Sequence, residues 1–176
     1  QDEAKHDFLT GCYNRFQLEP SYERFASLAH EKGFSFSYAI FDIDHFKEVN
    51  DTRGHLGGDQ ALRGVAESVQ SRIDRRHIFI RYGGDEFILL SLHHDLAQMA
   101  MFCEKLRATI EATMDGITMS FGVSTWHGVG DSMHTLMERA DRALYCSKEK
   151  GRNSVSTEGE AACCATCANA NAEHHR

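Results

Sequence analysis

The chain has 176 residues, 41% of them hydrophobic and 26% charged, which is typical of one soluble globular domain with its own core. Its formal net charge of −7 argues against broad electrostatic binding to nucleic acid or to an anionic membrane. No apolar run approaches the ~20 residues that span a bilayer, and there is no signal peptide or secreted disulfide framework, so we expect a cytoplasmic protein. The first residue is not Met, and we expect a piece of a larger protein whose regulatory part is missing.

The first half of the chain predicts a helix, a central strand and two further helical segments. Apolar residues recur at helical spacing between residues 18 and 29, Gly33 is a C-terminal stop, and Pro20 belongs in the first turn or at a bend. The stretch FSFSYAIFDID, residues 34–44, carries apolar side chains on both faces and predicts a strand covered on both sides. We expect residues 45–58 to form a short helix and a glycine-rich turn, followed by a second helix.

The second half predicts a hairpin, two helices and two more strands. The runs HIFIRY and DEFILLSL flank Gly83 and Gly84, which favours a two-residue loop with positive φ. The whole order contains the βαββαβ core of a ferredoxin-like sheet, an α+β fold with added helices. We expect one domain over residues 1–157, with a lead-in at 1–6, and a disordered tail over 158–176.

Two aspartates lie where the predicted topology brings them together. Asp42 is near the end of the central strand and Asp85 begins the return strand of the hairpin, so their carboxylates could converge. Converging carboxylates repel one another and favour a cation, for which Mg²⁺ is the natural choice because it prefers oxygen ligands and substrate phosphates. The alternative is two separate, solvated surface acids. Asp44 precedes a helix and is expected to be its N-cap.

Side-chain alternation separates the two neighbouring acids of the hairpin. Successive strand residues point to opposite faces, so Asp85 and Glu86 should not reach the same metal. A two-residue loop would pair Arg81 with Glu86, and we expect a cross-strand ion pair between them. That leaves Asp85 for the chemistry.

Several polar residues are candidates for binding a nucleotide. Lys47 lies in the first turn of the short helix, where free N–H groups already attract phosphate, while Lys148 and Arg152 close the last helix four residues apart. For the latter pair, compensation of the helix dipole is the competing interpretation. The segment after Asp42 carries an amide, an imidazole and a carboxylate; the amide and the carboxylate together could read a guanine edge, but the sequence alone favours turn formation. The three residues are Asn50, His55 and Asp59.

Five motifs in order resemble those of the GGDEF family of diguanylate cyclases. They are DFLTGCYNR, FDIDHFKEVNDTRGHLGGD, RYGGDEF, SFGVS and ADRALYCSKEKGRN, and together they extend from about Asp7 to Val155. The resemblance implies an enzyme that joins two GTP molecules into cyclic di-GMP and releases two pyrophosphates. It also implies a bacterial cytoplasmic setting, a homodimer in which each domain binds one GTP, and a sensory or dimerisation domain before this chain.

The resemblance also implies roles for individual residues. Mg²⁺, with Mn²⁺ as a possible substitute, would be held by Asp42, the backbone carbonyl of Ile43, and Asp85. Asp85 and Lys47 would be the catalytic residues, with Asp85 acting as base toward the 3′-hydroxyl, as metal ligand, or as both. The substrate ligands would be Asn50 and Asp59 at guanine, His55, and the phosphate-binding set Phe46, Lys47, Lys148 and Arg152.

The sequence departs from the family at one point and leaves two questions open. Where many members carry an inhibitory RxxD site for product, this chain reads Asp74-Arg75-Arg76-His77, and we expect product inhibition through that site to be absent or weak. The tail residues Cys164, Cys167, His174 and His175 suggest either a zinc site or, in our preferred interpretation, a solvated tail. A non-catalytic receptor for GTP or cyclic di-GMP, or a cyclase with another product, is the alternative function.

Overall fold

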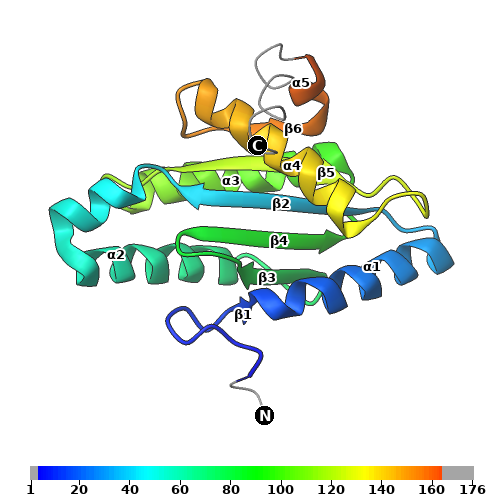
Figure 1. Ribbon diagram of the computed structural model, residues 1–176, viewed down its shortest axis with the longest axis horizontal. Coiled ribbons are helices and arrows are strands. Elements are labelled where there is room, and N and C mark those ends of the chain that lie inside the picture. Colours follow the sequence, from blue (N-terminus) through cyan, green and yellow to red (C-terminus); the bar gives the residue numbers. More distant parts are fainter. Residues whose placement is uncertain (1–3, 164–176) are drawn as a thin grey trace, which may run out of the picture.

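A six-stranded sheet with the order β1-β3-β4-β2-β5-β6 forms the middle layer of the computed structural model, which describes residues 4–163 (Figure 1). β2 lies between β4 and β5 and is antiparallel to both, whereas the outer pairs β1–β3 and β5–β6 are parallel. The strands are β1 Tyr13–Asn14, β2 Phe36–Ile43, β3 His77–Arg81, β4 Glu86–Leu92, β5 Met119–Thr125 and β6 Val155–Thr157. The expected α+β fold with a ferredoxin-like core is confirmed.

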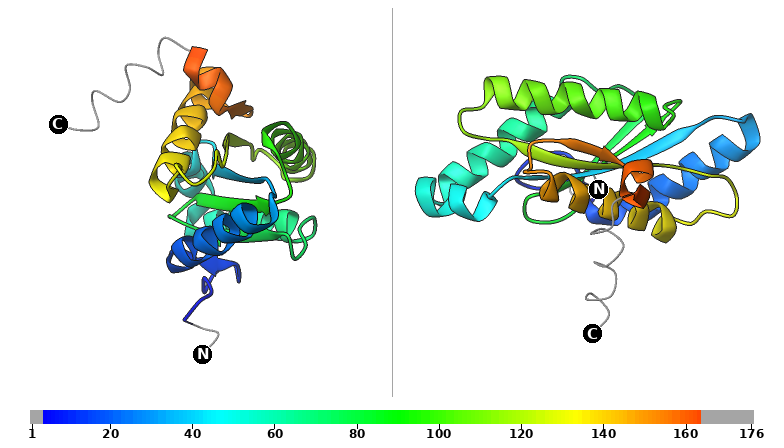
Figure 2. Two further views of the ribbon diagram at one scale, coloured as in Figure 1. Left: turned by 90° about the vertical axis from the view of Figure 1, so that its right-hand side faces the viewer. Right: turned by 90° about the horizontal axis from the view of Figure 1, so that it is seen from above.

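Helices cover both faces of this sheet (Figure 2). α1 and α4 pack on one face, and α2 and α3 on the other. The helices are η1 Arg15–Gln17, α1 Leu18–Lys32, α2 Phe46–Gln70, α3 Leu96–Thr113, α4 Met133–Glu149 and α5 Glu158–Cys163. None of the helices in the described part of the chain combines the length and apolarity that a membrane span requires.

The central strand divides its side chains between two cores, as its sequence predicts. Phe36, Tyr38 and Ile40 face α1 and α4, while Phe41 and Ile43 belong to the core under α2 and α3. All eight residues of β2 are buried. Because helices cover both faces of β2, the strand is fixed in place, and so are the residues at its C-terminal end.

Helix boundaries agree with the sequence signals for α1 and differ for α2. Pro20 lies in the first turn of α1, and Gly33 ends that helix in the left-handed conformation at φ 69°. Between Phe46 and Gln70 a single kink at Gly54, φ 73° and ψ 175°, takes the place of the expected glycine-rich turn. Gly57 and Gly58 remain helical, because only one residue is needed to redirect the helix axis.

Two further predictions need correction. The GGDEF hairpin does not have a two-residue loop, since β3 ends at Arg81 and β4 begins at Glu86, and neither glycine between them has positive φ. The predicted tail from residue 158 is wrong for residues 158–163, which form α5. Glu158 accepts a hydrogen bond from the Thr125 N–H and contacts Arg139, so the chain stays anchored past β6. Residues 164–176 lie outside the described part of the chain.

Candidate active site

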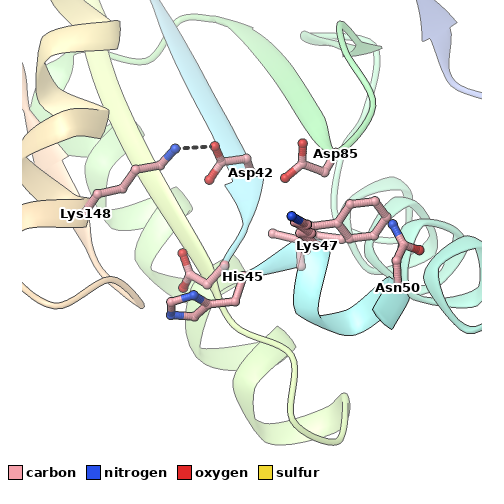
Figure 3. A pocket seen from close by; sticks show the side chains of 9 residues that line it. Asp42, His45, Lys47, Asn50, Asp85 and Lys148 are labelled. Carbon is pink, nitrogen blue, oxygen red and sulfur yellow. Dashed lines mark hydrogen bonds and ion pairs between the residues drawn. The ribbon is translucent and has the colours of Figure 1, made fainter. Parts of the chain in front are cut away.

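A pocket of about 450 Å³ opens where β2 ends and α2 begins (Figure 3). Side chains from three separate parts of the chain meet there: the β2–α2 junction, the hairpin between β3 and β4, and the last turn of α4. The lining residues are Asp42, Ile43, Asp44, His45, Phe46, Lys47, Asn50, Asp85 and Lys148. The sequence prediction that Asp42 and Asp85 converge is therefore correct.

Asp42 is an almost fully buried carboxylate, 8% exposed, at the end of the central strand. Its Oδ2 accepts a hydrogen bond from Lys148 Nζ at 2.6 Å, whereas its Oδ1 is buried without a partner. Burial raises the pKa of Asp42; the hydrogen bond and charge of Lys148 oppose that rise, and Asp85 and Asp44 add to it. A buried carboxylate with one unsatisfied oxygen is costly, and a cation is the simplest group that would satisfy it.

Asp85 faces the same pocket and has no ion-pair partner within the described residues (Figure 3). Burial raises its pKa, and the charges of Lys148 and Arg81 only partly offset that effect. The backbone carbonyl of Ile43 is directed to the same side. The Asp44 N–H donates to the carbonyl of Thr118, the residue before β5, and in a trans peptide unit the preceding C=O points the opposite way, toward the β4 edge.

The predicted ion pair between Arg81 and Glu86 is wrong. Arg81 lies opposite Phe87, not Glu86, because the loop holds Tyr82–Asp85 and the N–H groups of both Tyr82 and Gly83 donate to the Glu86 carbonyl. This shift of one residue puts Arg81 and Glu86 on opposite faces of the sheet.

Arg81 instead pairs with Asp7 of the N-terminal segment. The two side chains are 3.2 Å apart and only 17% and 20% exposed, and the guanidinium also donates to the Gly84 carbonyl. The Asp7 carboxylate additionally accepts from the N–H and hydroxyl of Thr10. An acid followed three residues later by a threonine is a turn signal in DFLTG, so the sequence contained a clue that Asp7 has a structural role.

Two more acids, Glu86 and Asp141, lie near the pocket, and the sequence did not predict their place there. Glu86 lies directly opposite Asp42 in the β2–β4 ladder, and its pKa is raised by burial and then by the charges of Asp141, Asp42 and Asp85. The pKa of Asp141 on α4 is also raised, first by desolvation and then by Glu138. Acids on neighbouring elements thus repel one another at this end of the sheet, and Lys148 is the cation that lowers several of their pKa values.

The first turn of α2 supplies the basic, aromatic and amide side chains of the pocket. His45 precedes the helix in the left-handed conformation, φ 54°, and makes no capping hydrogen bond, so the helix begins abruptly beside the acids. Phe46, Lys47 and Asn50, which the family resemblance implies as substrate ligands, all line the pocket. The N-terminus of a helix carries free N–H groups and partial positive charge, which suits an anionic ligand.

Three predicted substrate residues lie outside the pocket. His55 follows the kink and is exposed, and Arg152 is exposed after α4. Asp59 lies beside Gly58, where a Cβ atom would meet Asn50 Oδ1 at 1.9 Å. The kink at Gly54 therefore folds the second half of α2 back so that the backbone next to Asp59 touches Asn50, although the sequence placed these two residues nine positions apart.

Asp44 is not the N-cap of α2, contrary to the sequence expectation. It is 7% exposed, and its carboxylate accepts hydrogen bonds from the hydroxyls of Thr118 and Ser120 and from the Asn153 N–H. Residue 45 intervenes before the helix, which carries the Asp44 side chain toward β5 and away from the helix end.

This arrangement can bind a phosphorylated ligand together with a divalent cation. No group of three or more acids, histidines or cysteines that could hold a metal is present in residues 4–163, so any cation would be shared between two carboxylates, a backbone carbonyl and the ligand itself. That sharing is the usual mode for Mg²⁺ at phosphate-handling sites. Lys47 and Lys148 flank the acids and can neutralise the phosphates.

The chain matches a known protein family. Residues 4–154 match the model of the family described as "Diguanylate cyclase, GGDEF domain". The chain belongs to the GGDEF family. Because this match covers nearly all described residues, the GGDEF domain and the fold described above are the same unit.

Relatives of this GGDEF domain are found among both sequences and structures. It is 39% identical over 165 residues to Diguanylate cyclase VdcA of Vibrio cholerae, covering 88% of this chain and 47% of that protein. It is 34% identical over 161 residues to Response regulator PleD of Caulobacter vibrioides, covering 86% of this chain and 36% of that protein. The chain thus spans less than half the length of these curated relatives.

A solved structure supports the same conclusion at the level of the fold. The GGDEF domain of DgcB from Caulobacter crescentus, crystallised in complex with c-di-GMP, superposes with a TM-score of 0.83 at 34% identity, covering 90% of this chain and 95% of that one.

The segment that replaces RxxD in this GGDEF domain is occupied by its own contacts. Asp74 forms an ion pair with Arg76 at 2.9 Å and accepts from the Arg76 N–H, and it also contacts the ring of the buried His77 at 3.1 Å. The carboxylate of Asp74, the one acid of the segment, is therefore already engaged by residues of the same segment. The candidate zinc ligands of the tail lie outside the described residues 4–163, so the choice between a zinc site and a solvated tail stays open.

Proposed function

We propose that this GGDEF domain is a diguanylate cyclase that condenses two GTP molecules into cyclic di-GMP and releases two pyrophosphates. The observation that carries the proposal is the convergence of Asp42 and Asp85 in one pocket with Lys47 and Lys148. Buried acids with raised pKa values next to phosphate-binding cations are typical of a site that handles a metal and a nucleotide. The family membership supports the same reaction.

A divalent cation fits the residues present. Asp42 offers a buried oxygen without a partner, Asp85 offers a second carboxylate, and the Ile43 carbonyl is directed toward the same edge. We propose that these three groups hold Mg²⁺, for which Mn²⁺ would substitute. When bound, such an ion neutralises phosphate charge and makes a hydroxyl more acidic.

The side chains of the pocket would bind and orient the substrate. Lys47, Lys148 and the N-terminus of α2 would contact the triphosphate, with Phe46 beside them and Arg152 reaching in from the turn after α4. Asp85 would take the proton of the 3′-hydroxyl or fix the group that acidifies it. Its raised pKa suits a proton acceptor better than that of an exposed aspartate.

The base would be read at the kink of α2. Asn50 lines the pocket, and the Gly58 contact brings the backbone beside Asp59 against it. An amide can donate to guanine O6, while a carboxylate accepts from N1–H and the exocyclic amine. Both therefore support GTP over ATP, and His55 is proposed as an additional substrate contact from the exposed side of the kink.

Turnover would require two copies of the domain. The proposed reaction joins two nucleotides, and each chain supplies one such pocket. Each copy would therefore present the 3′-hydroxyl of its bound GTP to the α-phosphate of the GTP bound by the other copy. We propose an antiparallel homodimer, driven by a sensory or dimerisation domain in the larger bacterial cytoplasmic protein. No contact with nucleic acid or membrane is assigned to this domain.

The decisive experiment incubates the purified chain with GTP and Mg²⁺ and measures cyclic di-GMP across a range of protein concentrations. We expect product, a rate that rises more steeply than linearly with protein, and no product with EDTA or with ATP in place of GTP. If GTP binds but no product forms at high protein concentration, the domain is a receptor. If GTP does not bind at all, the proposed nucleotide site is wrong.

A further inference from the structure

The buried carboxylate of Asp44 is fully used inside the protein. Its Oδ1 accepts from Ser120 Oγ at 2.6 Å, and its Oδ2 accepts from Thr118 Oγ1 at 2.7 Å and from the Asn153 N–H at 2.9 Å. Charge-assisted hydrogen bonds of this kind are stronger than neutral ones and fix direction. Asp44 therefore differs from Asp42, which keeps an unpartnered oxygen, and it is not needed as a metal ligand.

The third of these bonds holds a strained turn. Arg152 and Asn153, which follow α4, both have positive φ, 66° and 45°. The left-handed conformation disfavours a side chain such as that of Arg152, and asparagine less so, and Arg152 keeps it only because surrounding contacts impose it. The bond from the Asn153 N–H to Asp44 is one such contact.

Further contacts come from α3 and α4. The Asn153 side chain accepts from Arg107 Nη1 at 2.8 Å and donates to Glu111. The Arg152 N–H donates to the Ser147 carbonyl of α4 at 3.0 Å. Arg107 is itself held by Glu104 and Glu111 and is only 17% exposed. The turn is thus held from three sides: by Asp44 from the end of β2, by the Arg107–Glu111 pair from α3, and by Ser147 of α4.

We propose that Asp44 is a positioning residue that sets where Arg152 presents its guanidinium to the triphosphate. The inference rests on the proposed function, because Arg152 matters only if the pocket binds GTP. The turn follows the end of α4, which carries Lys148, and its Asn153 N–H donates to Asp44 beside the end of β2, which carries Asp42. Asp44 anchors Asn153, the residue next to Arg152, to the strand end that carries Asp42, and in this way fixes where the Arg152 backbone lies relative to both of these ligands.

The test is a double-mutant cycle on the full chain, with 3′-deoxy-GTP as probe. This nucleotide keeps the triphosphate and the base but lacks the attacking hydroxyl, so binding is measured without turnover. The variants are Asp44→Asn, which keeps the shape of the side chain and removes its charge, Arg152→Ala, and both together. Guanosine binding serves as the control, because it lacks the phosphates.

We expect each single change to weaken binding of 3′-deoxy-GTP by about 10-fold, the loss of one charge-assisted contact. The double variant should be no weaker than Arg152→Ala alone, and guanosine affinity should not change, because Asp44 acts through Arg152. A general structural effect would instead multiply with the Arg152→Ala loss and would weaken guanosine as well. Either of those results overturns the inference.

Thr118→Val provides a second variant if Asp44→Asn fails to fold. It removes one donor to Asp44 and keeps the volume, and we expect a 2- to 5-fold weaker affinity for 3′-deoxy-GTP that again disappears in the Arg152→Ala background. An unchanged affinity in Thr118→Val and Asp44→Asn would refute the positioning role. Failure of the unmodified chain to bind 3′-deoxy-GTP would instead refute the proposed function, and with it this inference.

Discussion

The two ends of the sheet's central strands handle charge in opposite ways. Where β2 begins and β5 ends, Arg139 contacts Asp131 at 2.5 Å, Glu158 at 2.6 Å and the Thr125 carbonyl at 2.9 Å. Where β2 ends, Asp42, Asp85 and Glu86 lie close to one another, and Asp42 is the one with a cation in ion-pair contact, Lys148. The first end is electrostatically satisfied and the second is not.

The pKa values follow this difference. Burial raises the pKa of Asp131, but hydrogen bonds from Arg139 and Thr135 outweigh that effect and bring it to about 2. Burial also raises the pKa values of Asp42, Asp85 and Glu86, the charge of Asp85 adds to the rise at Asp42 and Glu86, and Lys148 only partly offsets these effects. The fold neutralises the buried side chain of Asp131 at the first end, and the weaker compensation at the second end supports the proposed cation and nucleotide site.

The largest expected effect is on turnover at the unsatisfied end. Asp85→Asn keeps the size of the side chain and removes both its charge and its capacity to accept a proton. We expect the rate of cyclic di-GMP formation to fall by at least about 1000-fold, as for loss of a metal ligand or base. Product chromatography with saturating GTP measures this rate, and a variant that retains normal turnover would contradict the assignment of Asp85.

The matched change at the other end, near Arg139, should affect stability rather than turnover. Asp131→Asn breaks the pair with Arg139 and leaves a partly buried guanidinium short of a partner, which costs about 3 kcal/mol and lowers Tm by roughly 6–12 °C. Turnover per folded molecule should stay near normal. Circular dichroism melts together with the product assay check both halves, and a strong loss of turnover in still-folded protein would show that the two ends are not independent.

A pH series of thermal melts sharpens the contrast further. The raised pKa values of Asp42, Asp85 and Glu86 mean that the folded chain binds protons more tightly than the unfolded chain, so these groups lower stability as pH rises above the ordinary carboxyl range of about 4. Asp131 acts oppositely, since its contribution is present above that range and is lost as pH falls toward its pKa of about 2.

Mg²⁺ should reverse the loss of stability that Asp42, Asp85 and Glu86 cause as pH rises. The ion requires deprotonated ligands, so we expect it to raise Tm by a few degrees at pH 7.5 and to lose that effect as pH falls through the raised pKa values. Asp131→Asn should keep the Mg²⁺ response. A Tm that does not respond to Mg²⁺ at any pH would argue against a metal site at this end.

The smallest expected effect concerns the segment 74–77. Its acid resembles Asp131 in being fully paired: hydrogen bonds from Arg76 hold the pKa of Asp74 well below its usual range. We expect no tight non-competitive inhibition by cyclic di-GMP, and no change in inhibition when Arg75 and Arg76 are both replaced by Ala. Tight inhibition that is lost in the double variant would contradict this expectation.

The fold and the convergence of Asp42 and Asp85 could be predicted from the sequence because both depend on local patterns and on the order of the elements. Alternation in residues 34–44 defined a strand buried on two faces, and the order of elements then brought Asp42 and Asp85 together. The errors came from features that depend on register and tertiary contact. A shift of one residue in the hairpin register moved Arg81 away from Glu86, and nothing in the local sequence identifies Asp7 as its partner.

Asp44 is a second case in which a tertiary contact could not be predicted from the local sequence. Its position before a helix favoured an N-cap, but one left-handed residue, His45, turned the side chain toward β5 and Asn153. The contribution of Glu86 and Asp141 to the acidic end likewise required knowing which elements pack beside β2.

The most direct test of the central claim compares the thermal stability of the unmodified chain and Asp85→Asn in EDTA at pH 7.5, without nucleotide. If the acids at the end of β2 are held in mutual repulsion for a cation, removing one charge should raise Tm of the metal-free protein, by about 1–4 °C, while abolishing the further rise caused by Mg²⁺. A lower Tm for Asp85→Asn in EDTA, or an unchanged response to Mg²⁺, would contradict the account.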